Sequence, residues 1–243
     1  MVHITGIRHL LLDIEGTTCP VSYVAEVLFP YAATRLNGYL AAHQHDPDLQ
    51  PLLRDVQQAW RQDHDPDAAA LRQRQPPAGL ADYLGLLIQQ DRKLTALKDL
   101  QGMIWAAGYD SGELVAPLYA DVPAALRRWH QAGVQLAVYS SGSVAAQQLL
   151  YGHSNAGDLR GLFSHWFDTR TGAKQDADSY QHIALALGSP AAAVLFISDC
   201  LEECQAATAA GMAVLFSDRP GNPHRQPGPF ERIDNYADLQ LQP

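Results

Sequence analysis

Apolar positions along this chain form short continuous runs separated by stretches of helical spacing. Runs of four to six residues rich in Val, Leu, Ile and Phe are typical of strands buried on both faces. Four such runs end in small or acidic residues, at positions 9–12, 134–139, 194–197 and 212–216. A weaker run at 163–167 is expected to form a strand at the edge of the sheet.

Helical periodicity fills the segments between these runs. It is found at 122–131, 144–151, 179–187 and 202–210. Strands that alternate with helices indicate an α/β fold, because parallel strands need crossover helices that pack on the faces of the sheet. The pattern therefore predicts a doubly wound parallel sheet.

A long helical segment interrupts this alternation after the first strand. It has no convincing β run but shows helical periodicity at 23–40, 49–61, 80–90 and 92–108. Such a segment is too long for a simple crossover. We predict an inserted helical domain at 20–116 and a core made of 1–19 and 117–243. Breaks between its helices are expected at 63–67 and 74–79, and the Pro- and Gly-rich segment 218–229 is predicted to be a surface loop.

Composition narrows the classes of function. The chain has 243 residues, 47% of them hydrophobic, and a formal net charge of −9. This charge disfavours nucleic acid and anionic membrane surfaces as partners, whereas a small phosphate pocket is compatible with it. No apolar run approaches the roughly 18 residues of a membrane span, and the N-terminus lacks a leader pattern. Three cysteines, an odd number, indicate thiols in a reducing compartment, so we expect a cytoplasmic protein.

Residues suited to chemistry follow the predicted strands or precede a helix. Because the carboxyl ends of parallel strands meet at one edge of a sheet, groups distant in sequence are expected to converge there. The clusters are Asp13 with Glu15 in Asp-Ile-Glu-Gly-Thr-Thr, the turn Ser140-Ser141-Gly142-Ser143, Lys174, and Asp199 with Glu202 and Glu203.

These residue types suit phosphoryl chemistry with a metal ion. Asp13 and Asp199 offer the hard oxygen ligands that Mg²⁺ prefers, and Glu203, one turn later, is expected to support the metal's outer shell. The serine turn places hydroxyls and free N–H groups at a helix start, where phosphate binds readily, and Lys174 adds a point charge. A carboxylate nucleophile forms an aspartyl-phosphate intermediate, while a second carboxyl handles protons.

Each cluster also has a simpler explanation. Strand-end acids are often solvated or cap a helix, serines such as Ser143 commonly cap helices, and a lone lysine is usually a surface charge. Cys200 and Cys204 share a helix face, and a soft-metal site that includes Cys19 is the alternative for them, but buried inert thiols explain these cysteines better. The functional interpretation is favoured because all four clusters occur together.

The four clusters resemble the four signatures of haloacid dehalogenase superfamily phosphatases. Glu15 stands where most of these phosphatases carry Asp. Together with the blocks 28–31, 91–105 and 139–147, this points to the acireductone synthase, or enolase-phosphatase, branch of methionine salvage. The resemblance covers nearly the whole chain, and the block 91–105 belongs to the cap and is specific to the branch.

The resemblance implies a Mg²⁺-dependent enzyme with one ion per subunit. Its substrate is 2,3-diketo-5-methylthiopentyl 1-phosphate, which is enolised and then dephosphorylated to the acireductone. Asp13 is implied as nucleophile and metal ligand, Glu15 as acid/base through its carboxyl and metal ligand through its backbone carbonyl, and Asp199 as metal ligand. The helical insert is implied to be a cap, and the protein a monomer.

Substrate binding is carried over in the same way. Ser140, Ser141 and Gly142 are implied to bind substrate, and Lys174 to hold the phosphate. The base that removes the α-proton stays open between Glu15 and a cap residue, as do the cap side chains that grip the methylthio tail. Two alternatives also stay open: a general small-phosphate phosphatase and a non-catalytic phosphoprotein- or metabolite-binding module. The presence of Asp13, Lys174 and Asp199 argues against the latter.

Overall fold

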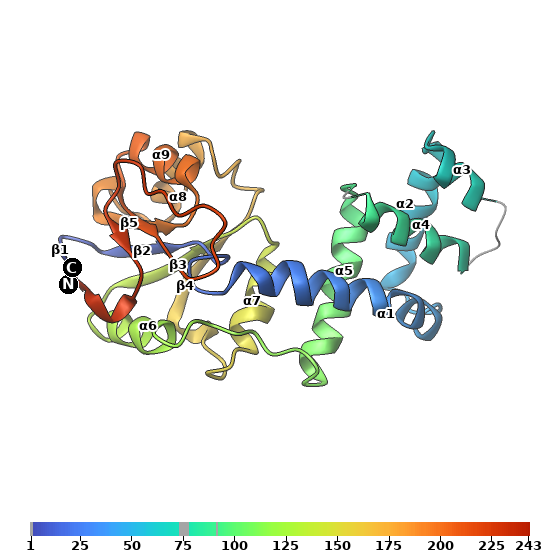
Figure 1. Ribbon diagram of the computed structural model, residues 1–243, viewed down its shortest axis with the longest axis horizontal. Helices are drawn as coiled ribbons and strands as arrows, with labels where there is room; N and C mark the ends of the chain where they lie inside the picture. Colours follow the sequence, from blue (N-terminus) through green and yellow to red (C-terminus); the bar gives the residue numbers. More distant parts are fainter. Residues whose placement is uncertain (1, 73–77, 91) are drawn as a thin grey trace. The chain divides into compact units, whose positions relative to one another are not determined.

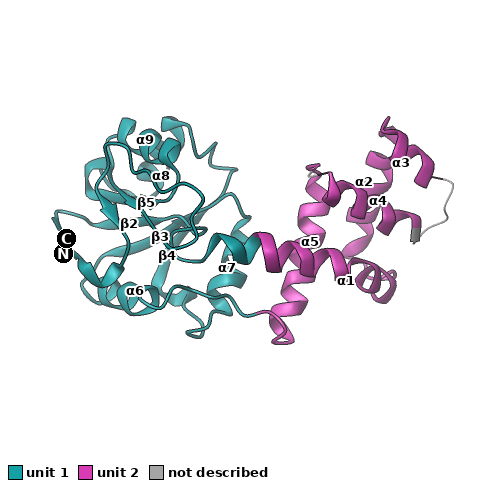
Figure 2. Cartoon of the chain, viewed as in Figure 1, with its two compact units in different colours: residues 1–24, 115–243 teal, residues 25–114 magenta. Residues whose placement is uncertain are grey.

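The computed structural model describes residues 2–72, 78–90 and 92–243, and its chain divides into two compact units (Figure 2). Residues 1–24 and 115–243 form the first unit, and residues 25–114 form the second. The second unit lies within the segment 20–116 that was expected to be an insert.

A six-stranded parallel sheet forms the centre of the first unit. Its strand order is β4-β3-β2-β5-β6-β7, and every neighbouring pair runs parallel. The strands are β2 His9–Leu12, β3 Gln135–Tyr139, β4 Phe163–Phe167, β5 Val194–Ser198, β6 Ala213–Ser217 and β7 Arg232–Ile233. The expected parallel sheet is confirmed, and β4 lies at its edge as predicted.

Continuous apolar runs form the middle of this sheet because helices cover both of its faces. Leu10, Leu11 and Leu12 of β2 are fully buried, as are all five residues of β5. Helices α8 (Ala177–Ala186) and α9 (Leu201–Ala209) pack on one face through Tyr180, Ile183 and Ala207. Helices α6 (Val122–Gln131) and α7 (Val144–Gly152) lie on the other face (Figure 1). All four helices were predicted, with ends that differ by up to two residues.

Three short strands were not predicted from the sequence. Strand β1 (Val2–Thr5) pairs in parallel with β8 (Leu239–Gln242) in a separate two-stranded sheet. Strand β7 has two residues and adds an edge to the main sheet. Strands this short carry too few apolar positions for a recognisable period. Three 3₁₀ turns, Arg160–Leu162, Ala191–Ala193 and Tyr236–Asp238, complete this unit.

The second unit is helical. A π-helical turn, Tyr23–Leu28, leads from the first unit into α1 (Phe29–Ala42), followed by α2 (Leu49–Gln62), α3 (Pro66–Leu71), α4 (Ala78–Gln89) and α5 (Thr95–Asp110). The four expected helical stretches are present. The expected break at 74–79 falls largely on residues 73–77, which lie outside the described part of the chain.

Helix α3 corrects part of one expectation. The loop expected at 63–67 does separate two helices, but it ends at Asp65, and Pro66 and Asp67 begin α3. The Asp65 carboxylate accepts hydrogen bonds from the backbone N–H groups of Asp67 (2.8 Å) and Ala68 (3.1 Å), and Pro66 occupies the first turn. Proline is compatible with this position because its missing N–H would have no intrahelical partner there.

The segment 218–229 corrects another. It was expected to be a surface loop, and most of its residues are exposed, but Asp218, Arg219 and Asn222 are at least 94% buried. Arg219 donates to the Asp121 carboxylate (2.9 Å) and to the carbonyl of Thr17 (3.3 Å). The prolines and glycines correctly indicated irregular backbone, but they do not predict which polar side chains of that segment are buried.

Within the described residues, no helix is long and apolar enough to span a lipid bilayer.

Candidate active site

The carboxyl ends of β2, β3 and β5 meet at a cavity of about 670 Å³ in the first unit. Residues from all four sequence clusters line it: Asp13, Glu15, Ser141, Lys174, Asp199, Glu202 and Glu203. Asp13 directly follows β2, and Asp199 directly follows β5. These strands are neighbours in the sheet, which brings together residues that are far apart in the sequence.

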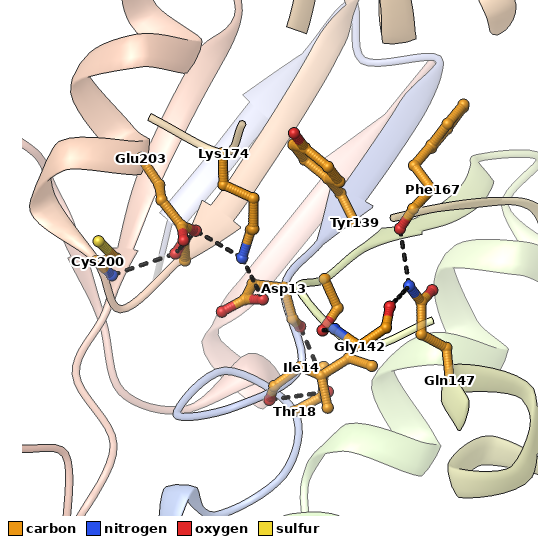
Figure 3. A network of polar contacts seen from close by, with 12 residues as sticks. Asp13, Ile14, Thr18, Tyr139, Gly142, Gln147, Phe167, Lys174, Cys200 and Glu203 are labelled. Atoms are coloured by element: carbon orange, nitrogen blue, oxygen red, sulfur yellow. Dashed lines mark hydrogen bonds and ion pairs between the residues drawn. The ribbon is translucent and has the colours of Figure 1, made fainter. Parts of the chain in front are cut away.

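Lys174 lies between two carboxylates of this cavity (Figure 3). Its Nζ is 2.6 Å from Asp13 Oδ1 and 2.7 Å from Glu203 Oε2. Burial opposes the charge of this lysine, but the two carboxylates outweigh burial and raise the pKa of Lys174 above its ordinary value. The lysine is therefore a buried, charged group, and the surface-charge interpretation of it is wrong.

The other carboxyl groups of the site have raised pKa values, so their ionised forms are disfavoured. Burial is the largest cause that raises the pKa of Glu15 and of Asp199 to about 7, and the neighbouring Asp13 carboxylate adds to it. Burial and Asp13 likewise raise the pKa of Glu203 to about 7, against the opposing effect of Lys174. The ion pairs of Lys174 in the described site are with Asp13 and Glu203, so this cation does not pair with Glu15 or Asp199.

This charge and these oxygen donors fit a hard divalent cation. Among the described residues, no group of three or more His, Cys, Asp and Glu side chains is arranged to enclose a metal ion. Gly16 adds a close approach: a Cβ at this residue would lie 2.0 Å from Asp199 Oδ2, so the glycine lets the carboxylate lie against the loop.

Local and long-range hydrogen bonds hold the loop after Asp13 in place. The Thr18 hydroxyl lies 3.4 Å from the Asp13 carbonyl and 3.3 Å from the Ile14 carbonyl, and 2.7 Å from the Tyr151 hydroxyl. The carbonyl of Gly16 accepts from Ser217 Oγ and from Asn222 Nδ2, both at 2.9 Å. Sequence reasoning missed these supporting residues, because lone polar residues in a loop or helix carry no pattern that marks them.

The three serines of the turn 140–143 have different roles in the structure. Ser140 is 4% exposed, and its Oγ accepts the backbone N–H of Gly142 (3.2 Å), so it belongs to the turn rather than to the cavity lining. Ser141 lines the cavity. Ser143 caps α7, where its Oγ accepts the N–H of Ala146 (3.3 Å). The capping alternative is thus confirmed for Ser143.

Gln147 anchors this turn and was not singled out in the sequence. Its side chain is buried, and its Nε2 donates to the carbonyls of Gly142 and Phe167, both at 2.8 Å (Figure 3). Phe167 is the last residue of β4. The glutamine therefore ties the turn after β3 to the end of the neighbouring strand.

The segment after β6 contributes to the cavity as well. Pro223, His224, Arg225 and Gln226 are lining residues. Their position could not be read from a sequence in which this segment shows only turn signals.

The cysteines are free thiols. Cys19 and Cys204 are buried, and Cys200 is partly exposed. Burial, with a smaller contribution from Glu15, raises the pKa of Cys19 to about 12. Burial also raises the pKa of Cys200 to about 11. Burial and the raised pKa agree with the inert-thiol interpretation for Cys19, whereas Cys200 is not buried and lines the cavity.

Comparisons with known proteins agree with this geometry. A family model described as haloacid dehalogenase-like hydrolase matches residues 7–211. Two proteins named Enolase-phosphatase E1 are each 52% identical to the chain. The one from Synechococcus sp. (strain RCC307) aligns over 92% of this chain and 90% of its own length, and the one from Parasynechococcus marenigrum (strain WH8102) over 96% and 98%.

Solved structures show the same fold. The UTR4 protein of Saccharomyces cerevisiae superposes with a TM-score of 0.74 at 34% identity, over 96% of this chain and all of that one. CbbY from Rhodobacter sphaeroides, in complex with phosphate, reaches a TM-score of 0.57 at 20% identity over 97% of both chains, which shows a shared fold.

The chain therefore belongs to the haloacid dehalogenase-like hydrolases. Within that class it is a phosphatase, and its similarity is to the proteins named Enolase-phosphatase E1.

Proposed function

We propose that this phosphatase is a Mg²⁺-dependent enolase-phosphatase of methionine salvage. It converts 2,3-diketo-5-methylthiopentyl 1-phosphate to the acireductone and phosphate through an aspartyl-phosphate intermediate. The observation that carries the proposal is the Lys174 ammonium between Asp13 and Glu203, in a cavity that Glu15 and Asp199 also line. The 52% identity to proteins named Enolase-phosphatase E1 supports the choice of reaction.

Asp13 is proposed as the nucleophile. One of its carboxylate oxygens attacks phosphorus, and the bond between phosphorus and the substrate oxygen breaks. Water then attacks the phosphorus of the aspartyl-phosphate, which releases phosphate and regenerates the carboxylate. This covalent route splits a very slow displacement into two easier steps. Backbone hydrogen bonding supports the assignment, since the N–H of Asp13 donates to the carbonyl of Ile197 (3.0 Å) and holds the residue at the sheet edge.

Glu15 is proposed as the general acid and base. It gives a proton to the departing enediol oxygen and takes one from the attacking water. A carboxyl with a pKa of about 7 is suited to both tasks near neutral pH, because neither protonation state is strongly disfavoured. Glu15 is also a candidate base for the enolisation step, with a side chain of the helical insert as the alternative.

Lys174 is proposed to hold the transferred phosphoryl group through its charge. Ser141, which lines the cavity, and the Gly142 turn at the start of α7 are proposed to bind the same group. Ser140 is proposed to contribute by shaping this turn, through the hydrogen bond that its Oγ accepts from Gly142. A buried cation is effective here because charge–charge interactions strengthen where water is excluded.

Asp13, Asp199 and the backbone carbonyl of Glu15 are the groups proposed to hold Mg²⁺, with Glu203 supporting them. The ion would neutralise charge on the phosphoryl oxygens and make the α-proton of the diketone more acidic. The helical insert is proposed to serve as a cap that excludes water from the reaction, as lids commonly do. We further propose a monomer, as the family resemblance implies. We also propose that it acts on a small substrate, because the net charge of −9 disfavours a long polyanion.

The test is to incubate the purified protein with Mg²⁺ and the diketone phosphate. Acireductone, followed by the ultraviolet absorbance of its conjugated enediol, should form in step with phosphate. Phosphate release without the enediol would reduce the proposal to a general small-phosphate phosphatase.

The variant Asp13→Asn tests the nucleophile. It should fold but show no turnover and form no beryllofluoride adduct; turnover in this variant would refute the nucleophile. Absence of both turnover and adduct in the unmodified protein would support the non-catalytic alternative.

A further inference from the structure

Asn222 is a buried residue beside the loop after Asp13, and only one half of its side-chain amide has protein partners among the described residues. It lies in the segment after β6 and is 6% exposed. Its Nδ2 donates to the carbonyl of Gly16 (2.9 Å) and to the carbonyl of Ser217 (3.2 Å). An amide nitrogen carries two hydrogens. Both are used, so the orientation of the side chain is determined and its oxygen points away from these carbonyls.

The Asn222 oxygen has no hydrogen-bond partner among the described residues. A buried polar atom without a partner is costly, and such atoms in folded proteins commonly meet a water or an ion. The place that Oδ1 faces is defined by Gly16. A Cβ on Gly16 would lie 2.9 Å from Asn222 Oδ1 and 2.0 Å from Asp199 Oδ2. The amide oxygen and the Asp199 carboxylate therefore approach the same side of the same glycine.

We propose that Asn222 Oδ1 accepts a hydrogen bond from a water molecule bound to the Mg²⁺ ion that Asp199 holds. This inference rests on the proposed function, because it takes the metal from there. Mg²⁺ keeps several of its waters, and each is a strong donor that needs an acceptor. Asn222 supplies an acceptor without adding negative charge to a site that already has several carboxylates. Groups in this position usually set both the orientation of a metal ligand and the affinity of the site.

The chain offers a matched control in Ser217. Its Oγ donates to the carbonyl of Gly16 at 2.9 Å, the same distance as Asn222 Nδ2. Ser217→Ala removes one hydrogen bond from the catalytic loop and leaves Asn222 Oδ1 in place. Asn222→Ala removes a hydrogen bond from the same carbonyl, the hydrogen bond to the carbonyl of Ser217, and the oxygen. Ser217→Ala therefore controls for the lost support of the Gly16 carbonyl.

The experiment is isothermal titration of metal-free protein with MgCl₂, without substrate. Asn222→Ala should raise the dissociation constant for Mg²⁺ by about tenfold to a hundredfold. Ser217→Ala should change it by much less. Thermal unfolding in EDTA should show a larger loss of stability for Asn222→Ala, which removes two hydrogen bonds, than for Ser217→Ala, which removes one. Asn222→Ser, whose hydroxyl is too short to replace Oδ1 where it lies, is measured in the same way if Asn222→Ala does not fold.

An unchanged dissociation constant in the Asn222 variants would overturn the inference and leave the proposed function intact. Equal weakening by Ser217→Ala would also overturn it, since Asn222 would then act only through the loop. If the unmodified protein bound no Mg²⁺, the metal in the proposed function would fail first, and the inference with it. Tenfold weaker binding in Asn222→Ala alone supports the inference.

Discussion

The Lys174 ammonium lies 2.6 Å from Asp13 Oδ1, although 161 residues separate the two along the chain. Lys174 also contacts Glu203 Oε2, and Ser198 Oγ donates to that same carboxylate oxygen at 2.8 Å. The end of β2, the segment before α8 and the first turn of α9 thus share one charged contact. Any change at its centre should affect both the fold and the chemistry.

Replacement of Lys174 by Met should lower kcat/KM by about 10²–10³-fold, because the transition state loses its buried cation. The protein should also be less stable at pH 8, where Asp13 and Glu203 are left without their partner. Arg170→Met is the control, since the Arg170 side chain is 86% exposed, and it should change kcat/KM by no more than about twofold. Steady-state kinetics and urea unfolding measure both effects. Equal activity of Lys174→Met and the control would contradict the assignment.

Stability without metal should fall as pH rises from 5 to 8. The folded pKa values of Glu15, Asp199 and Glu203 are about 7, above the ordinary values of 4.5, 3.8 and 4.5. In this window the folded state binds more protons than the unfolded state. The stability that this provides is full below the ordinary pKa and is lost as pH passes through the folded pKa.

Calorimetry in EDTA should therefore show a lower Tm at pH 8 than at pH 5, and saturating Mg²⁺ should remove most of this difference because the cation stabilises the ionised carboxylates. Asp199→Asn removes one of the titrating groups, so its metal-free Tm should depend less on pH than that of the unmodified protein. A steeper pH dependence in this variant would show that the sign of the Asp199 contribution is wrong.

Replacement of Gly16 by Ala should disable the site, because the new Cβ would lie 2.0 Å from Asp199 Oδ2. Displacement of a catalytic group by about 1 Å costs on the order of 10²-fold in rate. Gly6→Ala is the matched control: Gly6 also has a positive φ, +78° against +66°, but a Cβ there meets no atom within 4 Å. It should cost about 1–2 kcal/mol of stability and leave kcat/KM unchanged. Similar kinetics for the two variants would show that the close approach to Asp199 does not matter.

Replacement of Gln147 by Leu should loosen the serine turn. It removes the donor that the carbonyls of Gly142 and Phe167 share, although the Phe167 carbonyl still accepts the N–H of Ser140 (3.2 Å), and it should destabilise the protein by about 2 kcal/mol. KM should rise more than kcat falls, because the turn is proposed to bind the phosphoryl group. Gln148→Leu, at the next and partly exposed position, should change stability by less than about 0.5 kcal/mol. Urea unfolding and kinetics provide the readouts, and an unchanged KM in Gln147→Leu would argue against a binding role for the turn.

Much of the core was predictable because its signals are local. Strands β2 and β5 are continuous apolar runs, and α6 begins and ends at the residues that its periodicity predicted. Helix α3 was missed because an Asp-Pro pair is common in loops and is also common at the start of a helix, where Asp65 and Pro66 lie here. Strands β1 and β8 were missed because each has only two apolar residues, alternating with polar ones, and depends on the other, at the far end of the chain, for its hydrogen bonds.

The sequence by itself determined the elements of the core and the placement of carboxylates, serines and a lysine next to their ends, because apolar runs and turn residues act over a few positions. Tertiary structure alone decided that Lys174 lies between Asp13 and Glu203, that the Ser140 hydroxyl belongs to a turn, and that Asn222 contacts Gly16 across 206 residues. Contacts of this kind depend on strand order and on which side chains a loop turns inward. Both are settled by packing of the whole unit, which no local pattern records.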